Sequence, residues 1–432
     1  MKIISTGDAQ FEEVFRRITQ RGNVFDEKIW TVVKSIVEDV AERKDNALFE
    51  YTEKFDRCVL NAETVVVSVK EREEALSTIG EEEKDLLRLA AQRVEIFHRT
   101  QEMSDCFLSN EKGIELGLRV LPLERVGIYA PGGLAAYPST VIMAAVPAKI
   151  AGVEDIILVT PAPNGRVSPL VIAAAQLSGV TRIFKIGGAQ AIAALAFGTE
   201  SIPKVDKIVG PGNAYVAAAK KMVYGHVAID MIAGPSEVVI IADANAPPSH
   251  VAADLLAQAE HDEMASAVLL TPDPGLAGEV LSEVKAQGKR LQRKSIVFRS
   301  LEAFGAIVVT RDMDEAIEIS NRFAPEHLEL MVENPWEMLS RIRNAGAVFL
   351  GYNTPEVLGD YIAGPNHILP TAGTARFASP LGVYDFVKRS SVLSFSAESL
   401  RNYGYQASRF AQMEGLEAHG KSVVARLRRK KP

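Results

Sequence analysis

Several histidine and amide or carboxylate side chains in this sequence stand at spacings that suit metal binding. Gln258 and His261 are three residues apart in a helix-patterned stretch, so both would project from one face of a helix. An amide oxygen and an imidazole nitrogen placed in this way can bind one metal ion. The local pattern leaves an alternative open, in which His261 is a partly buried histidine that caps a helix or forms an ion pair.

A carboxylate and an imidazole are adjacent at Glu326 and His327, directly before a short apolar run. Such a pair can supply two bases of different strength near neutral pH. Asp360 and His367 occupy a Gly/Pro-rich stretch that is typical of a site loop. Taken alone, the Glu326–His327 pair is equally compatible with ordinary solvent-exposed polar residues.

Four glycine-rich turns indicate a second kind of site, one that binds a nucleotide. They begin at Gly127, Gly187, Gly210 and Gly234. Glycine lets backbone N–H groups approach a phosphate closely, and a helix that starts there adds partial positive charge. The G-x-G-x-x-G fingerprint is absent, so that motif does not assign the cofactor. Tight strand-to-helix turns alone also explain the glycines, with Tyr129 in the core and Asn213 as a helix N-cap.

The elements that must position these residues follow from the hydrophobic pattern, which predicts an α/β protein. Short apolar runs followed by Gly/Pro turns and helical segments are typical of parallel sheets. The expected strands are 126–129, 156–160, 183–186 and 207–209, then 238–241, 267–270, 306–309 and 347–350. We therefore expect two tandem, doubly wound, incomplete Rossmann-like parallel-sheet domains with a helical N-terminal region and a helical C-terminal tail. Ligands are expected at the carboxyl ends of the strands.

Composition narrows the class of protein. The 432 residues suffice for two or three domains, and 47% hydrophobic with 24% charged residues is typical of a globular chain. The net charge of −7 disfavours a nucleic-acid-binding surface. Two cysteines, Cys58 and Cys106, are too few for a disulfide framework or a Cys-rich zinc site. No apolar run has the length of a membrane span and no secretory core is present, so we expect a cytoplasmic protein.

The order of the motifs is much more specific than any one of them. It runs Tyr-Ala-Pro-Gly-Gly, Gly-Gly-Ala-Gln-Ala-Ile, Gly-Pro-Gly-Asn, Ala-Gly-Pro-Ser-Glu, Gln-Ala-Glu-His, Ala-Pro-Glu-His, Gly-Pro-Asn-His-Ile-Leu-Pro-Thr and Glu-Gly-Leu-x-Ala-His. Over roughly residues 20 to 420 this order resembles the histidinol dehydrogenase family. The resemblance implies a four-electron oxidation of L-histidinol to L-histidine through bound L-histidinal, with two NAD⁺, as the last step of histidine biosynthesis.

The resemblance also implies a role for individual residues. One zinc ion per subunit would be bound by Gln258, His261, Asp360 and His419. The substrate would contact Ser236, Gln258, His261, His327, Asp360, Glu414 and His419. NAD would contact Tyr129, Gln190 and Asn213. Of the two adjacent bases, His327 suits the proton transfers and Glu326 suits activation of water.

The family is homodimeric, and the resemblance implies that the tail of one subunit brings Glu414 and His419 to its neighbour's site. The expected organisation is a helical segment 1–25, a large α/β domain 26–125 plus 237–380 with the metal and catalytic residues, an NAD-binding domain 126–236, and a helical tail 381–432. Two alternatives remain: a zinc- and NAD-dependent dehydrogenase of another small polar alcohol, and a metal-dependent binding protein without catalysis.

Overall fold

The structure, a computed structural model, describes residues 1–21, 27–132 and 136–427. The chain forms two compact units. The larger contains Met1–Gln101 and Leu123–Phe386, and the smaller contains Glu102–Pro122 and Val387–Pro432. Gly133, in the first glycine-rich turn, lies outside the described residues, as does the boundary expected at residue 25.

A five-stranded parallel sheet lies in the larger unit. Its strands are β4 (Arg125–Tyr129), β5 (Asp155–Val159), β6 (Arg182–Phe184), β7 (Lys207–Val209) and β8 (Ala228–Ile229), in the order β6-β5-β4-β7-β8. The chain winds outward from β4 in one direction through β5 and β6, then crosses back to β7. The switch in winding direction therefore falls between β4 and β7, where doubly wound sheets usually bind ligands.

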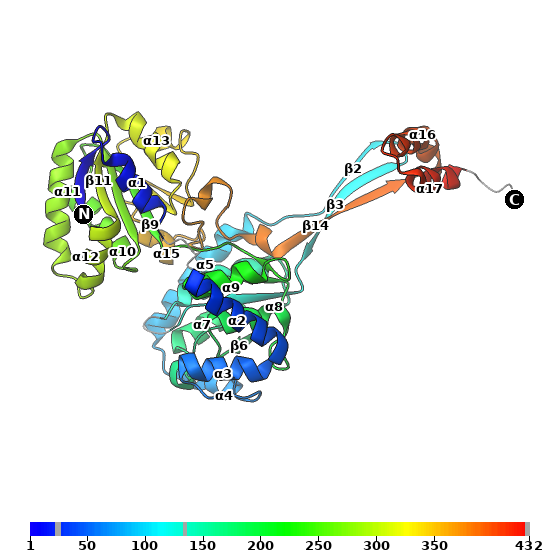
Figure 1. Cartoon of the computed structure of the whole chain (residues 1–432), viewed down its shortest axis with the longest axis horizontal. Coiled ribbons are helices and arrows are strands. Elements are labelled where there is room, and N and C mark those ends of the chain that lie inside the picture. The colour runs from blue at the N-terminus through cyan, green and yellow to red at the C-terminus, as the bar shows by residue number, and fades with distance from the viewer. Residues whose placement is uncertain (22–26, 133–135, 428–432) are drawn as a thin grey trace. The chain divides into compact units, whose positions relative to one another are not determined.

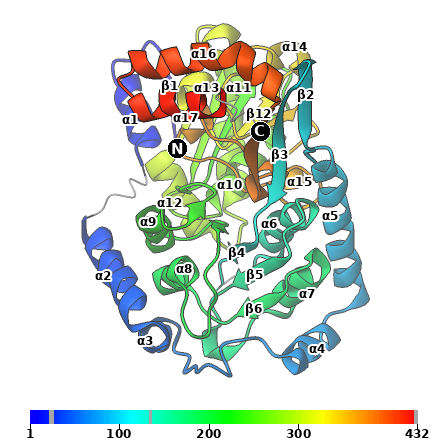
Figure 2. The same cartoon turned by 90° about the vertical axis from the view of Figure 1, so that its right-hand side faces the viewer.

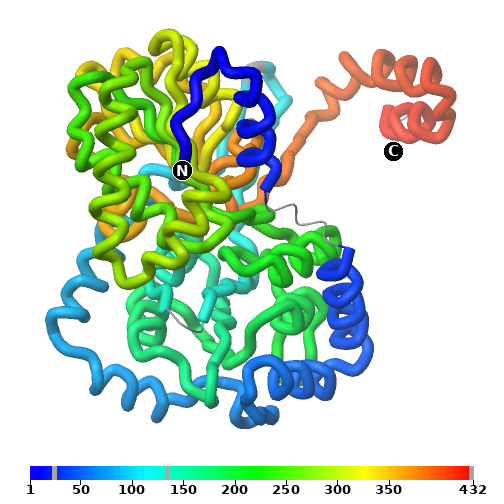
Figure 3. Tube along the Cα trace, turned by 60° about the vertical axis from the view of Figure 1, so that its left-hand side comes forward, coloured from blue at the N-terminus to red at the C-terminus, as the bar shows by residue number. Residues whose placement is uncertain are grey.

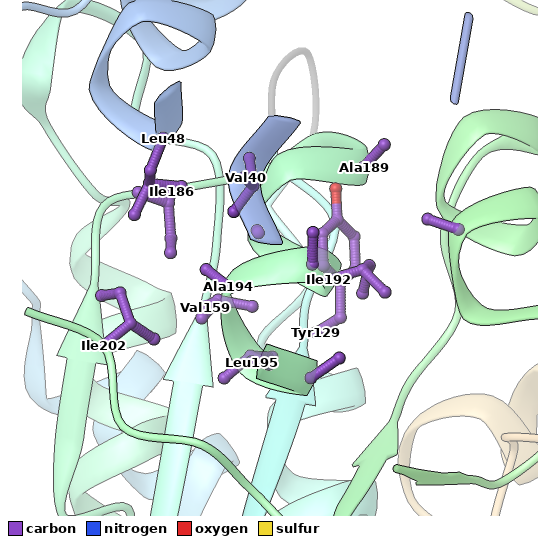
Figure 4. Packing of buried hydrophobic residues seen from close by; sticks show 14 of the residues in the cluster. Val40, Leu48, Tyr129, Val159, Ile186, Ala189, Ile192, Ala194, Leu195 and Ile202 are labelled. Carbon is purple, nitrogen blue, oxygen red and sulfur yellow. The ribbon is translucent and has the colours of Figure 1, made fainter. Parts of the chain in front are cut away.

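Helices cover both faces of this sheet in two successive layers. The inner ones are α6 (Pro138–Ile150), α7 (Pro169–Ser178), α8 (Gly188–Phe197) and α9 (Ala214–Val223), and the short 3₁₀ turn η1 (Pro163–Gly165) precedes α7. Outside α8 and α9 lie α2 (Glu27–Arg43) and α3 (Asp45–Asp56), whereas α4 (Val69–Ser77) and α5 (Glu81–Arg99) lie outside α6 and α7 (Figure 2). Apolar residues of α2 and α3, such as Val40 and Leu48, share one core with β5 and α8 (Figure 4).

A six-stranded parallel sheet forms the second half of the larger unit. Its strands are β1 (Lys2–Ser5), β11 (Gly305–Val309), β10 (Ser266–Thr271), β9 (Glu237–Ala242), β12 (His327–Met331) and β13 (Ala347–Leu350), in that spatial order. The N-terminal strand β1 runs alongside β11 (Figure 3). Without β1, the winding order is that of the five-stranded sheet, and the switch lies between β9 and β12.

Helices cover both faces of this sheet as well (Figure 1). One face carries α10 (Pro248–Ala259), α11 (Pro274–Gly288) and α12 (Lys294–Phe304), and the other carries α1 (Phe11–Thr19) and α13 (Met313–Phe323). Shorter elements complete the unit: α14 (Pro335–Leu339), α15 (Glu356–Tyr361), η2 (Thr374–Arg376) and η3 (Val383–Phe386). Strands such as β9 are buried on both faces, as expected for a parallel sheet between helix layers.

The smaller unit is an antiparallel sheet followed by a helical pair. The strands β2 (Cys106–Glu111), β3 (Ile114–Pro122) and β14 (Val387–Phe395) pair in the order β14-β3-β2. The helices α16 (Ala397–Met413) and α17 (Glu417–Leu427) pack against each other, with Gly415 at φ +75° between them. This unit is therefore built from two segments distant in the chain.

The two expected parallel-sheet domains and all eight expected strands are confirmed. Three parts of the expected organisation differ. Residues 1–25 are not purely helical, because Lys2–Ser5 adds an edge strand to the six-stranded sheet. Helices of the 26–125 region pack on the five-stranded sheet rather than with 237–380, because helical periodicity indicates a buried face but not its partner. The tail is not only helical, since it contains β14 before its two α-helices.

Candidate active site

Tyr129 and Gln190 lie at the carboxyl edge of the five-stranded sheet. Tyr129 ends β4, and its buried hydroxyl accepts the backbone N–H of Gly188 at 3.2 Å, at the start of α8 (Figure 4). Burial raises the pKa of Tyr129 to about 12, so the phenol stays protonated. Gln190 is buried in the first turn of α8. Both residues therefore stand where a helix N-terminus meets the sheet edge, a location that suits a phosphate group.

Asn213 follows β7 on the other side of the winding switch. It is exposed, and its side-chain oxygen accepts the N–H groups of Tyr215 and Val216 at 3.1 Å each. The N-cap interpretation of Asn213 is thus confirmed, while a contact with NAD stays a prediction.

A buried ion pair supports the loop that leads to Asn213. Asp230 accepts the N–H of Gly210 at 2.7 Å, and Lys220 donates to the carbonyl of Gly210 at 3.0 Å and pairs with Asp230. Gly210 has φ +110°, and a Cβ there would overlap the Tyr129 carbonyl oxygen. Only glycine therefore fits this close approach between the loop and β4.

Glu326 and His327 are placed at the amino edge of the six-stranded sheet, where β12 begins. The helix α13 ends at Ala324, which has φ +55°, and Pro325 follows. This stop turns the chain into the strand so that both side chains are buried beside the start of β9. Ligands are expected at the carboxyl ends of strands, whereas this residue pair lies at the opposite edge of its sheet. The catalytic role of the pair stays a prediction.

The hydrogen bonds of His327 define which ring nitrogen can act as a base. Its Nδ1 lies 3.2 Å from the carbonyl oxygen of Glu237, which can only accept, so Nδ1 carries the proton. The Nε2 atom is buried and has no hydrogen-bond partner among the described residues. Burial lowers the pKa of His327 to about 4, against the opposing effect of Asp360. The imidazole is thus neutral at pH 7, with the Nε2 lone pair unoccupied.

Glu326 is held in a buried network of charges. One carboxylate oxygen accepts the N–H of Glu237 at 2.9 Å, and the Glu237 side chain pairs with Arg21 at 2.8 Å. Burial, and then the negative charge of Glu237, raise the pKa of Glu326 well above its usual range. A carboxylate with a raised pKa is a stronger base when ionised, which suits it to take a proton from water.

Three of the four expected metal ligands lie in the larger unit. Gln258 is fully buried near the end of α10, His261 is exposed directly after that helix, and Asp360 is partly buried on α15. An Asp360 oxygen lies 3.8 Å from His327 Nε2. The structure thus places one expected metal ligand, Asp360, beside His327.

The donor set fits zinc, which accepts nitrogen and oxygen ligands. Among residues 1–21, 27–132 and 136–427, no three His, Cys, Asp or Glu side chains are gathered closely enough to hold a metal by themselves. In the larger unit, the expected ligand set includes only two side chains of these four types, His261 and Asp360. The amide of Gln258 would be the third ligand. The fourth expected ligand, His419, belongs to the smaller unit. Zinc binding stays a prediction.

The remaining expected residues are distributed over both units. Ser236 is partly buried just before β9, at the same amino edge as His327. Glu414 and His419 are both exposed, at the turn from α16 to α17 in the smaller unit. His367, which the sequence indicates as a loop residue, lies 2.8 Å from the Asp360 carbonyl oxygen through Nδ1, so its proton donor is turned toward α15.

Sequence reasoning missed three buried carboxyl groups next to the site: Asp254, Glu329 and Glu356. Each one lies on the same helix or strand as an expected site residue, one helical turn or two strand positions away from it. Asp254 precedes Gln258 by four residues on α10, Glu356 precedes Asp360 by four on α15, and Glu329 follows His327 by two on β12. This spacing, i to i+4 in helices and i to i+2 in a strand, is the signal that could have found them.

Comparisons with known proteins agree with these observations. The sequence model of the family described as histidinol dehydrogenase matches residues 19–427. The chain is 53% identical to the histidinol dehydrogenase of Syntrophotalea carbinolica, with 99% of each chain covered. It is 52% identical to that of Aquifex aeolicus, with 97% of each covered. A crystal structure of histidinol dehydrogenase from Elizabethkingia anophelis superposes with a TM-score of 0.93 at 38% identity, covering 99% of this chain and 98% of the other.

Proposed function

The chain belongs to the histidinol dehydrogenase family, and from this premise we propose that it oxidises L-histidinol to L-histidine with two NAD⁺, through bound L-histidinal. The observation that supports this most directly is the adjacent pair of buried bases at the start of β12. His327 is neutral with a free Nε2, whereas Glu326 is a carboxyl group with a raised pKa. Two oxidations of one carbon need two such bases, because their proton transfers differ.

The first oxidation requires one proton acceptor. As hydride leaves the carbinol carbon for NAD⁺, the hydroxyl proton passes to His327 Nε2, and the product is the aldehyde. The Nδ1–H bond to Glu237 holds the ring in the tautomer that leaves Nε2 ready to accept. In the reverse direction the same nitrogen returns the proton to the aldehyde oxygen.

The second oxidation requires water to add to the aldehyde. Glu326 takes one proton from the water as the water oxygen bonds to the carbonyl carbon. His327 gives the carbonyl oxygen the proton that it took in the first step, which completes the hydrate and frees Nε2 again. Hydride then leaves the hydrate for a second NAD⁺, His327 takes the hydroxyl proton, and the carboxylic acid forms. Neither cysteine is assigned a role: Cys58 lies in the core of the five-stranded sheet, and Cys106 lies on β2 of the smaller unit.

Zinc and NAD occupy separate places in this proposal. Gln258, His261 and Asp360 would hold one zinc ion per subunit with His419, and zinc when bound supplies a fixed point for the substrate amine and imidazole. Tyr129, Gln190 and Asn213 would contact NAD at the carboxyl edge of the five-stranded sheet. The substrate would reach Ser236, Gln258, His261, His327 and Asp360.

A second copy of the chain would complete each site. Glu414 and His419 are exposed at the α16–α17 turn, where they are accessible to another subunit. We propose a homodimer in which the tail of one subunit supplies both residues to the other, and we place the enzyme in the cytoplasm. Among the described residues, no helix has both the length and the apolar character to cross a membrane.

The decisive experiment counts NADH released from L-histidinol by the purified protein, measured by absorbance. Two NADH per L-histidinol consumed, with L-histidine as the product, is the expected result. One NADH with accumulation of aldehyde would contradict the four-electron reaction. Turnover of other small polar alcohols, with none of L-histidinol, would favour a related zinc- and NAD-dependent dehydrogenase instead.

Removing the metal tests the zinc site separately. A strong chelator should abolish activity while circular dichroism stays unchanged, because the ligands come from elements that pack independently of the metal. Added Zn²⁺ should restore activity. Full turnover by a sample shown to be metal-free would contradict the zinc assignment without affecting the assignment of the two bases.

A further inference from the structure

A layer of buried carboxyl groups lies next to the residues expected to bind metal and substrate. Glu356 is 1% exposed and Glu329 is fully buried. Glu329 accepts the backbone N–H of Glu356 at 2.9 Å. Burial, and then the charge of Asp254, raise the pKa of Glu329 well above its usual range. The layer therefore joins α10, β12 and α15.

Within this layer, Glu356 makes a direct contact with one expected metal ligand. When the Gln258 amide is oriented so that both groups are satisfied, its nitrogen donates to the two Glu356 oxygens at 3.1 and 3.3 Å. Because an amide is planar and its two branches diverge, the carbonyl oxygen of Gln258 then points away from Glu356. In the opposite orientation the Gln258 oxygen would face the Glu356 oxygens, and only a proton on Glu356 could join them.

The orientation matters because the two ends of an amide differ as metal ligands. The carbonyl oxygen has lone pairs for a cation, whereas the NH₂ group presents hydrogens. Glutamine is nearly symmetric in shape, so packing alone does not select one orientation. Burial and the neighbouring carboxyl groups, Glu329 first among them, raise the pKa of Glu356. In its ionised form Glu356 accepts hydrogen bonds only, and both of its oxygens lie within reach of the Gln258 nitrogen, so it selects the orientation in which the nitrogen faces it.

We propose that Glu356 is a positioning residue that turns the nitrogen of Gln258 inward and so leaves the carbonyl oxygen free to bind the metal. The proposal rests on the zinc site of the proposed function. Glu356 itself does not touch the metal. It acts as residues behind metal ligands generally do, by fixing the orientation of the ligand.

The test uses Glu356→Gln, which keeps the size of the side chain but replaces an acceptor-only group with one that can also donate. We expect Zn²⁺ to bind about 10–100-fold more weakly, measured by competition with a chromophoric chelator. The visible absorption of the Co²⁺-substituted protein should also change, because the ligand field depends on the donor atom. Thermal unfolding of the metal-free variant measures the effect of the substitution on the stability of the fold. A purely structural role of Glu356 would change this stability without changing the Co²⁺ absorption. The matched control is Glu329→Gln, a substitution in the same buried layer, because Glu329 has no hydrogen bond to Gln258 within the part of the chain that the structure describes. Its metal affinity should stay within about threefold of wild type.

A double variant separates orientation from packing. Glu356→Gln combined with Gln258→Glu exchanges the two groups, and the introduced carboxylate presents oxygen to the metal in either orientation. Zinc affinity should therefore recover by at least tenfold relative to Glu356→Gln alone. Wild-type affinity in Glu356→Gln, or no recovery in the folded double variant, would overturn the proposal. Absence of Zn²⁺ binding by the wild-type protein would be a different failure, that of the zinc site itself.

Discussion

The two parallel sheets of the larger unit have the same winding order but place their expected functional residues at opposite edges. In the five-stranded sheet, Tyr129 and Asn213 follow the ends of β4 and β7. In the six-stranded sheet, Glu326 and His327 stand at the start of β12, level with the start of β9. Equal topology therefore does not imply an equal site.

The difference follows from what each edge offers. Carboxyl edges of parallel strands lead into helix N-termini, whose free N–H groups suit phosphates, and the glycine turns after β4 and β7 fit that use. The amino edge of the second sheet offers no such groups at β12, but it carries buried ionisable side chains, whose pKa values burial shifts. In the proposed function, one sheet would thus supply backbone contacts to the cofactor and the other would supply the bases.

The largest expected effect is on the bases. Glu326→Gln keeps shape and hydrogen bonding but cannot take a proton from water, so L-histidine formation from added L-histidinal should slow by about 10²–10⁴-fold. Reduction of L-histidinal by NADH needs no water and should change far less. Both rates can be followed by NADH absorbance.

His327→Asn is the comparison for that measurement. It should impair both rates, because a proton moves at the carbinol oxygen in every hydride step. If Glu326→Gln slowed aldehyde reduction as strongly as acid formation, the two residues would act as one coupled base and the division of labour would be wrong.

The next largest effect is on the free energy of unfolding, at the Lys220–Asp230 ion pair that supports the loop leading to Asn213. Lys220 and Asp230 have 2% and 1% exposed side chains, so Lys220→Met leaves a buried charge without its partner. The free energy of unfolding in urea should fall by about 3–5 kcal/mol. Lys220→Met with Asp230→Asn removes the lone charge and should recover part of the loss. Ion pairs on a protein surface typically contribute about 0–1 kcal/mol. If Lys220→Met lowers the free energy of unfolding by no more than this, the pair is solvated.

A smaller effect is expected at Asn213. Asn213→Ala removes the acceptor for two N–H groups and should cost about 1 kcal/mol of stability. If the residue also contacts NAD, KM for NAD⁺ should rise while KM for L-histidinol stays constant. Asn213→Ser keeps the cap, so it isolates the cofactor effect. An equal rise in both KM values would contradict the assignment of this edge to the cofactor alone.

The smallest effect concerns His98, a fully buried histidine on α5, outside the five-stranded sheet. Burial lowers its pKa from 6.5. Below pH 6.5 the unfolded chain binds a proton that the folded chain excludes, so stability should fall as the pH falls, by at most about 1.4 kcal/mol per pH unit. Urea unfolding at pH 7 and 5.5 should show a shallower decline for His98→Gln. An unchanged decline would assign the pH dependence to other groups, such as His327 and His367, whose pKa values are also lowered.

The sequence by itself determined the strands with a continuous apolar pattern and the local motifs. Runs such as 126–129 and 238–241 are buried on both faces, so their composition alone marks them as strands of a parallel sheet. Strands with exposed faces, such as β2 and β14, carry no such run and were missed. The motif order also indicated the family, since eight short segments in sequence are far more specific than one.

Only the tertiary structure decided which groups meet and in what chemical state. Glu326 and His327 are adjacent in sequence, but the partners that set their pKa values and tautomer, such as Glu237, are about ninety residues away. Gln258 meets Glu356 across a similar distance in the chain. Hydrogen bonds and desolvation depend on separation in space, and periodicity in a sequence reports only which face of an element is buried, not what lies opposite that face.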